Sequence, residues 1–233
     1  PSGCPSAHYN AFYMASLLLY YLLTGERKYY NAGLKGLSTI MKFYPNTARE
    51  HSETQEYCRL ILPLAILWKV TDDREKKEWL YRVAADLNRF RHPKGGFLEW
   101  DTGYIACCAG GRDGEASVLA ENGDPVVDML YSLNWLPLSL CIAYYFTGDE
   151  YFREMRDYIT EFFISTQVIS PDPMINGIWP RSINIDEMEV YGVPNDIGWA
   201  PWSVETGWTM GEILSGLILT LLEDRLKDKL FSV

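Results

Sequence analysis

Three acidic residues stand where their neighbours favour proton transfer. Asp128 begins the segment DMLY, Glu53 lies in HSETQEY, and Glu205 lies in PWSVETGW between Trp202 and Trp208. Aromatic neighbours desolvate an acid, which raises its pKa as a general acid requires. Glycoside hydrolysis uses two carboxyl groups, one to protonate the leaving oxygen and one to activate water or attack the sugar. We therefore take Asp128, Glu205 and Glu53 as the candidate catalytic residues.

The same acids also have structural interpretations. Asp128 and Glu205 each precede an apolar helical segment, so they can cap a helix or stabilise its dipole. Ser52 and Gln55 form the pattern of a capping box around Glu53. These alternatives stay open on the sequence alone.

Aromatic residues are numerous, with eight Trp and sixteen Tyr among 233 residues. Sugar-binding clefts place such rings against the apolar faces of pyranoses, but rings also fill gaps between helices. Arg181 can hold a substrate carboxylate with its planar fork, or form an ordinary ion pair. The candidate substrate-binding residues are His51, Tyr57, Trp100, Tyr131, Asn134, Trp179, Arg181, Trp202 and Trp208.

Composition argues against several kinds of partner. The net charge is −10, from 31 acidic and 21 basic side chains, so no basic stripe is present to neutralise the phosphates of a nucleic acid. The longest apolar run, residues 15–23, is too short to cross a bilayer. Adjacent Cys107 and Cys108 lack the clustered ligands of a zinc site. We expect a soluble protein with a carbohydrate substrate and no nucleic acid, membrane, metal or cofactor.

Helical periodicity returns along the chain in pairs of segments. In one segment Tyr30, Leu34, Leu37 and Met41 form a single apolar stripe at spacings of four, three and four. A short turn of the form Thr-[Gly/Asp]-[Glu/Asp] joins the two segments of a pair, so they must lie antiparallel. We expect the acid of this turn in the first turn of the second helix. The expected hairpins span residues 9–43, 55–90 and 128–166, and a final helix spans 205–222.

The two helices of each expected hairpin differ in pattern. First helices such as LSLCIAYYFTG are apolar on nearly all sides, whereas second helices such as REKKEWLYRVAADLNRF are amphipathic. A helix that is apolar all round is buried, and one with a single apolar stripe lies outside. The pattern predicts one all-α domain built as an α/α-toroid, with a solenoid as the competing architecture. The amino termini of the inner helices of a toroid meet at one end, which would bring the candidate residues to one cleft.

Residues 124–151, DPVVDMLYSLNWLPLSLCIAYYFTGDEY, carry a resemblance to a known family. They resemble the Asp-x-Leu-Tyr, apolar-helix and Thr-Gly-Asp pattern of the unsaturated glucuronyl and rhamnogalacturonyl hydrolases, which are six-hairpin glycosidases. Residues 24–33 and 95–101 are similar to neighbouring parts of that family. The resemblance implies that Asp128 is catalytic. The family's second active-site aspartate has no counterpart here, because His51-Ser52-Glu53 stands at that place.

Three and a half hairpins are about half of a six-hairpin ring, which needs roughly 350 residues at this repeat length. We expect a fragment of a toroid, or a ring that a second chain or a missing segment completes. The leading function is hydrolysis of an oligosaccharide that contains uronic acid, by carboxylate acid/base catalysis. The alternatives are a polysaccharide lyase or sugar epimerase with His51 or Tyr57 as base, and a non-catalytic helical-repeat protein.

Overall fold

The chain is mostly helical in its computed structural model, which describes residues 5–47, 52–102, 122–191, 208–223 and 225. The α-helices are α1 (Ala11–Thr24), α2 (Arg27–Phe43), α3 (Glu53–Val70), α4 (Arg74–Asn88), α5 (Leu136–Thr147), α6 (Glu150–Ser165) and α7 (Trp208–Leu221). A 3₁₀ turn, η2 (Leu133–Trp135), leads into α5. The strands are β1 (Val126–Asp128), β2 (Ser182–Asn184) and β3 (Glu189–Val190).

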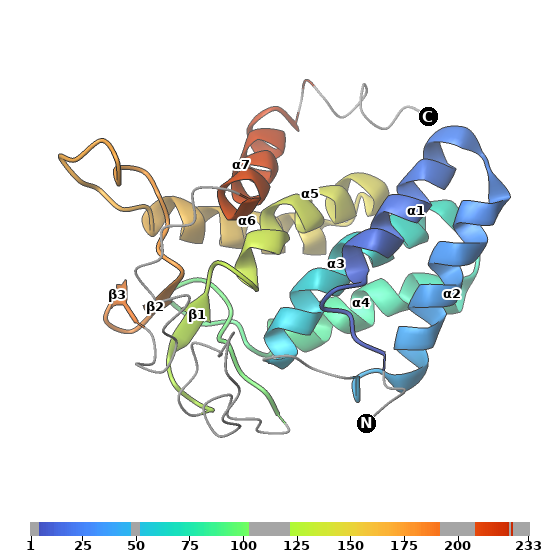
Figure 1. Ribbon diagram of the computed structural model, residues 1–233, viewed down its shortest axis with the longest axis horizontal. Coiled ribbons are helices and arrows are strands. Elements are labelled where there is room, and N and C mark those ends of the chain that lie inside the picture. Colours follow the sequence, from blue (N-terminus) through green and yellow to red (C-terminus); the bar gives the residue numbers. More distant parts are fainter. Residues whose placement is uncertain (1–4, 48–51, 103–121, 192–207, 224, 226–233) are drawn as a thin grey trace.

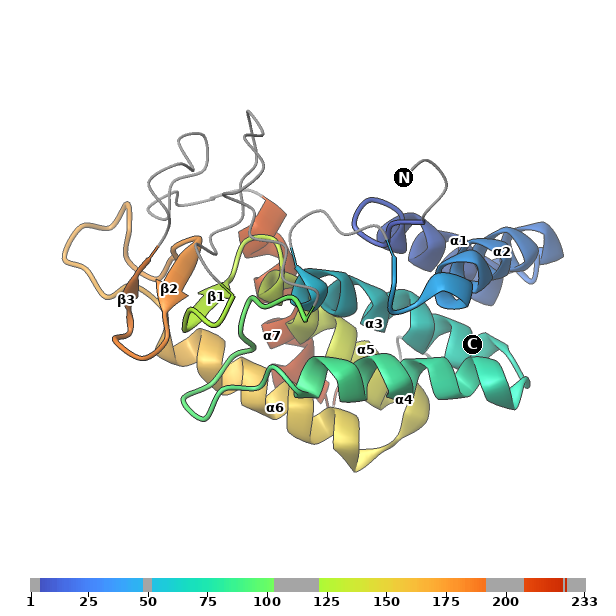
Figure 2. The same cartoon turned by 90° about the horizontal axis from the view of Figure 1, so that it is seen from below.

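The helices pair into antiparallel hairpins, and each hairpin contributes one helix to each of two layers (Figures 1 and 2). Each first helix packs on its own second helix, which gives the pairs α1–α2, α3–α4 and α5–α6. The first helices also pack on one another in chain order, α1 on α3, α3 on α5 and α5 on α7. This arrangement confirms an inner layer of first helices covered by an outer layer of second helices. Closure of these layers into a ring lies beyond the described part.

A threonine has the same role in each of the three hairpin turns. The hydroxyl oxygens of Thr24, Thr71 and Thr147 each accept the backbone N–H two residues further on, at 3.3, 3.2 and 3.1 Å. The side chains of Asp73 and Asp149 then accept a backbone N–H at the start of α4 and α6. All three acids occupy the cap position, one residue before the helical turn in which we expected them, but Glu26 makes no capping hydrogen bond with its side chain.

Burial differs strongly across the inner layer. In α3 every residue from 53 to 67 is buried, which the apolar pattern predicts for residues 60–67 but not for the polar residues before them. The helices at the two ends of the layer are open on one side, since Leu23 of α1 is 59% exposed and Leu221 of α7 is 84% exposed. The expectation that every first helix is buried all round is therefore wrong for α1 and α7. Each packs on only one first helix among the residues described.

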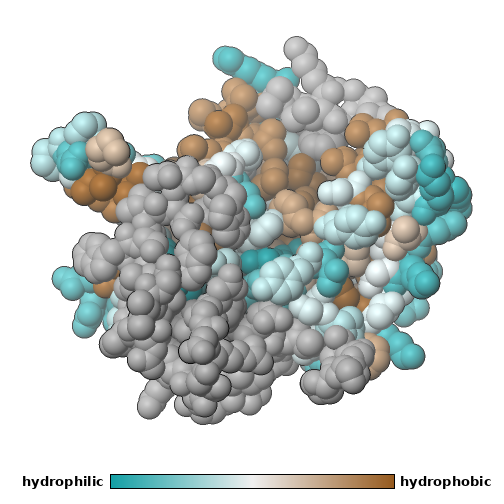
Figure 3. Space-filling view, viewed as in Figure 1, coloured by the Kyte–Doolittle hydropathy of each residue, from teal (hydrophilic) through white to brown (hydrophobic). Residues whose placement is uncertain are grey.

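An apolar groove of about 390 Å³ lies on the inner face of this layer. Figure 3 shows apolar side chains gathered on this side of the molecule, between α7 and α1. The groove is lined by Phe12, Ala15, Ser16, Leu19, Leu62, Ile66, Leu138, Ile142, Phe146 and Leu219. All four first helices contribute to it, so the groove is the concave side of the array.

The third hairpin begins later than its sequence pattern predicts. We expected a helix from Asp128, but Asp128 ends β1 and α5 begins at Leu136. Val126 and Val127 are β-branched and favour extended backbone. The Asp128 carboxylate then accepts backbone N–H groups two and three residues ahead, an arrangement that competes with helix. Pro137 stands in the first turn of α5, where a missing N–H costs nothing.

A small antiparallel sheet lies beside the amino end of α5 (Figure 1). Its strand order is β1-β2-β3, and its register pairs Val127 with Ile183 and Asp128 with Ser182. Two segments between hairpins, residues 94–102 and 176–185, both adjoin β1. Among the described residues, none of the helices is long and apolar enough to span a membrane.

Candidate functional site

The first part of the candidate site is a pair of buried carboxyl groups, Glu99 and Asp128. Oδ1 of Asp128 accepts the N–H groups of Leu130 and Tyr131, each at 2.8 Å. The backbone N–H of Glu99 donates to the carbonyl of Val126 at 2.8 Å, which places Glu99 beside β1. The two acids are 1% and 3% exposed, so protein groups must stabilise whatever charge they carry.

Two serine hydroxyls hold the Glu99 carboxyl group. Ser52 donates to Oε1 at 2.5 Å and Ser132 donates to Oε2 at 2.7 Å. Ser52 is also the cap of α3, because its Oγ accepts the N–H of Gln55 at 3.0 Å. The Ser52–Gln55 half of the predicted capping box is thus present. Its serine connects the start of α3 to the buried acid.

Burial dominates the protonation of this pair. Burial first and the neighbouring Asp128 charge second raise the pKa of Glu99 to about 8. Burial also raises the pKa of Asp128, while Arg181 opposes the rise. Nε of Arg181 lies 3.9 Å from Oδ2 of Asp128. Since like charges in one buried place disfavour double ionisation, the pair retains a proton near neutral pH.

The second part of the site surrounds Arg59 in the second turn of α3. Its guanidinium donates to the carbonyl of His8 at 2.7 Å and to the carbonyl of Tyr131 at 3.1 and 3.3 Å. It also lies 4.8 Å from the centroid of the Trp135 ring. These contacts hold a buried cation between the chain before α1 and the chain before η2.

Three acids from different elements act on Arg59. Burial lowers the Arg59 pKa, and the charges of Glu56, Glu212 and Asp128 raise it, in that order. Oε2 of Glu56 accepts the N–H of Ala7 at 2.9 Å. We call Glu56, Glu99, Asp128 and Glu212 the carboxylate cluster. Its members come from α3, the segment beside β1, β1 itself and α7, near the amino ends of the inner helices.

Glu212 is the least buried member of the carboxylate cluster. The side-chain amide of Asn134 donates to its Oε2. Burial raises the Glu212 pKa to about 7, and Asn134 and Arg59 oppose the rise. A carboxyl group that titrates near neutral pH and remains partly accessible can deliver or accept a proton. Asn134, predicted to bind substrate, is fully buried behind it.

Glu53, a predicted catalytic acid, is held by several donors. Its Oε1 accepts the hydroxyl of Tyr57, and its Oε2 accepts the N–H of Thr102 at 2.7 Å and the Thr102 hydroxyl. Arg89 lies 3.7 Å away. Burial and the hydrogen bond to Glu53 raise the pKa of Tyr57 above its ordinary value. Glu53 and Tyr57 therefore form a junction between α3 and the segment after α4, and both are almost wholly buried.

The predicted substrate-binding residues that the structure describes divide into two groups. Trp100 and Trp179 pack in the core, and each indole N–H donates to a backbone carbonyl, at 2.9 and 2.7 Å. Tyr131 and Arg181 adjoin the carboxylate cluster instead. The Arg181 guanidinium lies 5.4 Å from the centroid of the Tyr131 ring. The structure thus gathers Asp128, Tyr131, Asn134 and Arg181, and places Trp100 and Trp179 in packing roles.

Several predicted site residues lie outside the described residues. These are His51, Trp202 and Glu205, and they stay predictions. Trp208 begins α7, but its side chain is outside the described part. Within that part, no group of three or more His, Cys, Asp or Glu side chains is arranged to hold a metal ion.

Sequence reasoning missed Glu56, Arg59 and Glu212. One signal could have found Glu212, because it is an ionisable residue on a helix that is otherwise apolar. Glu212 is the only charged residue in the segment WTMGEILSGLILTL. Burying a charge is costly unless it is paired, so a lone charge on such a helix marks a buried polar group.

No protein-family model matches this chain, and no curated protein matches its sequence.

Proposed function

We propose that this chain is a glycoside hydrolase of the six-hairpin type, acting on an oligosaccharide that contains uronic acid. The observation that carries the proposal is the carboxylate cluster around Arg59, near the amino ends of the inner helices. Glycosidic bond cleavage needs two carboxyl groups with different protonation states. The resemblance of residues 124–151 to the unsaturated uronyl hydrolases supplies the substrate class.

Glu212 serves as the general acid in this proposal. Its pKa of about 7 keeps much of it protonated at neutral pH, and it is more accessible than the other members of the cluster. Asp128 serves as the second carboxyl group. One of its oxygens is held by two backbone N–H groups, which fixes the orientation of the other. Among the described residues, Arg181 forms the ion pair with Asp128 Oδ2 and favours its ionised form.

Closure of a toroid is part of the same proposal. The described helices make three hairpins and one further inner helix, and their concave face is the apolar groove of about 390 Å³. The side chains that line the groove are almost all apolar, and another helical segment would cover them. A second chain or a further segment of a longer protein would complete the ring and the substrate cleft.

The lyase and epimerase mechanisms receive less support. A tyrosine base needs a lowered pKa, whereas burial and the hydrogen bond to Glu53 raise the pKa of Tyr57. The other candidate base, His51, lies outside the described residues. Hydrolysis by carboxyl groups is the chemistry that the described side chains favour.

Hydrolysis of a panel of saturated and unsaturated uronide oligosaccharides tests the proposal. We expect Asp128→Asn and Glu212→Gln each to lower kcat by about 10²-fold or more, as for loss of a general acid or base. Asp72→Asn and Glu161→Gln change exposed acids away from the cluster and should retain full activity. The proposal fails if both cluster variants hydrolyse the active substrate at the wild-type rate. A newly formed product absorbing as an unsaturated uronide would instead establish a lyase.

A further inference from the structure

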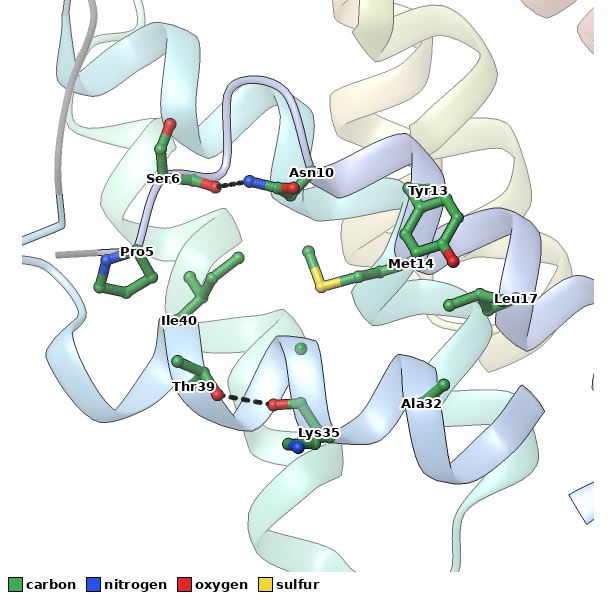
Figure 4. A pocket seen from close by; sticks show the side chains of 11 residues that line it. Pro5, Ser6, Asn10, Tyr13, Met14, Leu17, Ala32, Lys35, Thr39 and Ile40 are labelled. Atoms are coloured by element: carbon green, nitrogen blue, oxygen red, sulfur yellow. Dashed lines mark hydrogen bonds between the residues drawn. The ribbon is translucent and has the colours of Figure 1, made fainter. Parts of the chain in front are cut away.

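A second cavity lies between α1 and α2, apart from the carboxylate cluster (Figure 4). Its volume is about 410 Å³, which is room for one or two sugar rings. Its lining combines an apolar floor with polar groups at the rim. The lining residues are Pro5, Ser6, Asn10, Tyr13, Met14, Leu17, Ala32, Lys35, Gly36, Thr39 and Ile40.

The floor of the cavity is made by Met14 on Gly36. Met14 is 4% exposed, and its side chain points toward α2 in Figure 4. A Cβ atom at Gly36 would lie only 2.6 Å from the Met14 sulfur, so glycine is what lets the thioether lie flat on α2. The floor is therefore a fixed apolar surface, and a polarizable one.

Tyr13 supplies an exposed ring at one wall. Its side chain is 67% exposed, and it makes no ring contact with another described residue. An exposed, unstacked tyrosine beside an apolar floor is the arrangement that receives the apolar face of a pyranose. The hydroxyl leaves a polar handle at the rim.

Lys35 supplies the charge of the cavity. It is exposed and has no carboxylate within ion-pair distance among the described residues, although the chain carries a net charge of −10. Two neutral side chains line the same cavity, Asn10 from the α1 side and Thr39 from α2. The Asn10 amide donates to the carbonyl of Ser6 at 3.0 Å, and the Thr39 hydroxyl donates to the carbonyl of Lys35 at 2.8 Å. Both keep an oxygen that can accept a hydroxyl proton.

We propose that this cavity is a second sugar-binding site that takes an acidic pyranose, a uronate. The sugar ring lies on Met14 and against Tyr13, its carboxylate meets Lys35, and its hydroxyls donate to Asn10 and Thr39. The choice of an acidic sugar rests on the proposed function. The site shares no residue with the carboxylate cluster, so it holds substrate chains without cleaving them.

Binding of free monosaccharides to the chain tests this site, because a monosaccharide has no glycosidic bond to hydrolyse. The readout is the NMR signal of the Met14 methyl group, assigned by its loss in Met14→Leu. We expect D-glucuronate to shift this signal and D-glucose to bind about fivefold more weakly, as for loss of one exposed charge pair. Hexanoate, a carboxylate without a sugar ring, should bind more weakly than glucuronate.

Matched variants give the decisive comparison. Lys35→Gln should weaken glucuronate binding about fivefold and leave glucose binding unchanged, whereas Tyr13→Ala should weaken both. Lys42→Gln removes an exposed lysine of the same helix outside the cavity and should change neither. The inference is overturned if glucuronate leaves the Met14 signal in place, if Lys42→Gln acts like Lys35→Gln, or if hexanoate binds best. Glu212→Gln should lower kcat for hydrolysis by about 10²-fold or more and preserve this binding, so the two proposals can fail independently.

Discussion

Replacing Glu99 by glutamine should flatten the dependence of folding stability on pH. Glutamine keeps the shape of the side chain and can still bond to Ser52 and Ser132, but it does not titrate. Burial raises the Glu99 pKa from 4.5 in the unfolded chain to about 8 in the folded protein. The stability that the neutral acid supplies is therefore fully present below pH 4.5 and is lost as the pH rises through 8.

The size of the effect follows from this displacement. Between pH 5 and 7.5 the folded protein holds nearly one more proton than the unfolded chain at this group. One proton corresponds to about 1.4 kcal/mol per pH unit, so the free energy of unfolding should fall by about 3 kcal/mol across this interval. Asp128 titrates with Glu99, so the quantity measured belongs to the pair.

Urea unfolding followed by tryptophan fluorescence at several pH values between 5 and 7.5 measures this difference. We expect the wild-type protein to lose about 3 kcal/mol more than Glu99→Gln over the interval, with the same dependence on urea. Glu161→Gln changes an exposed acid of α6 and should follow the wild type. Parallel pH profiles for the wild type and Glu99→Gln would refute the conclusion that Glu99 is neutral in the folded protein.

Three further predictions concern other elements. If Glu212 is the general acid, kcat/KM should fall as the pH rises through about 7, because the acid loses its proton. A pH–rate profile measures this alkaline fall, which Glu212→Gln should lack. Gly216→Ala should destabilise the protein by about 2 kcal/mol, because a Cβ would overlap the backbone of Pro137 and Leu138. In the same helix, a Cβ at Gly211 would meet no atom within 4 Å, so Gly211→Ala should stabilise the protein by up to about 1 kcal/mol. Urea unfolding measures the free energy of unfolding of both variants. Asp149→Ala should cost about 1 kcal/mol in thermal melting through loss of the α6 cap, whereas Asp72→Ala should cost nothing measurable.

Local sequence pattern was sufficient to predict the helical hairpins. The stripe through Leu37 and Met41 is buried on α2, and the continuous apolar run of α3 is buried on every side. The repeated threonine turn also has a local cause, because Thr147 bonds within its own turn. In each case neighbours in the chain determine the structure.

The carboxylate cluster depends on contacts that local pattern does not encode. Glu99 reaches Asp128 because its strand-like segment bonds to β1, and Arg181 reaches Asp128 because β2 pairs with β1. These pairings join residues that lie tens of positions apart. The late start of α5 has a local cause, because Asp128 bonds to the backbone ahead of it and so delays the helix.

The unequal burial of the inner helices determines how the molecule opens. α3 is enclosed by α1, α4 and α5, so its amides can exchange with solvent only when most of the array separates. Among the described residues, α1 packs on α3 and α7 packs on α5, so either end helix can detach while α3 keeps its contacts with α4 and α5. Hydrogen exchange should therefore proceed inward from both ends of the array, as in other stacked-repeat proteins, and α3 should be the last helix to exchange.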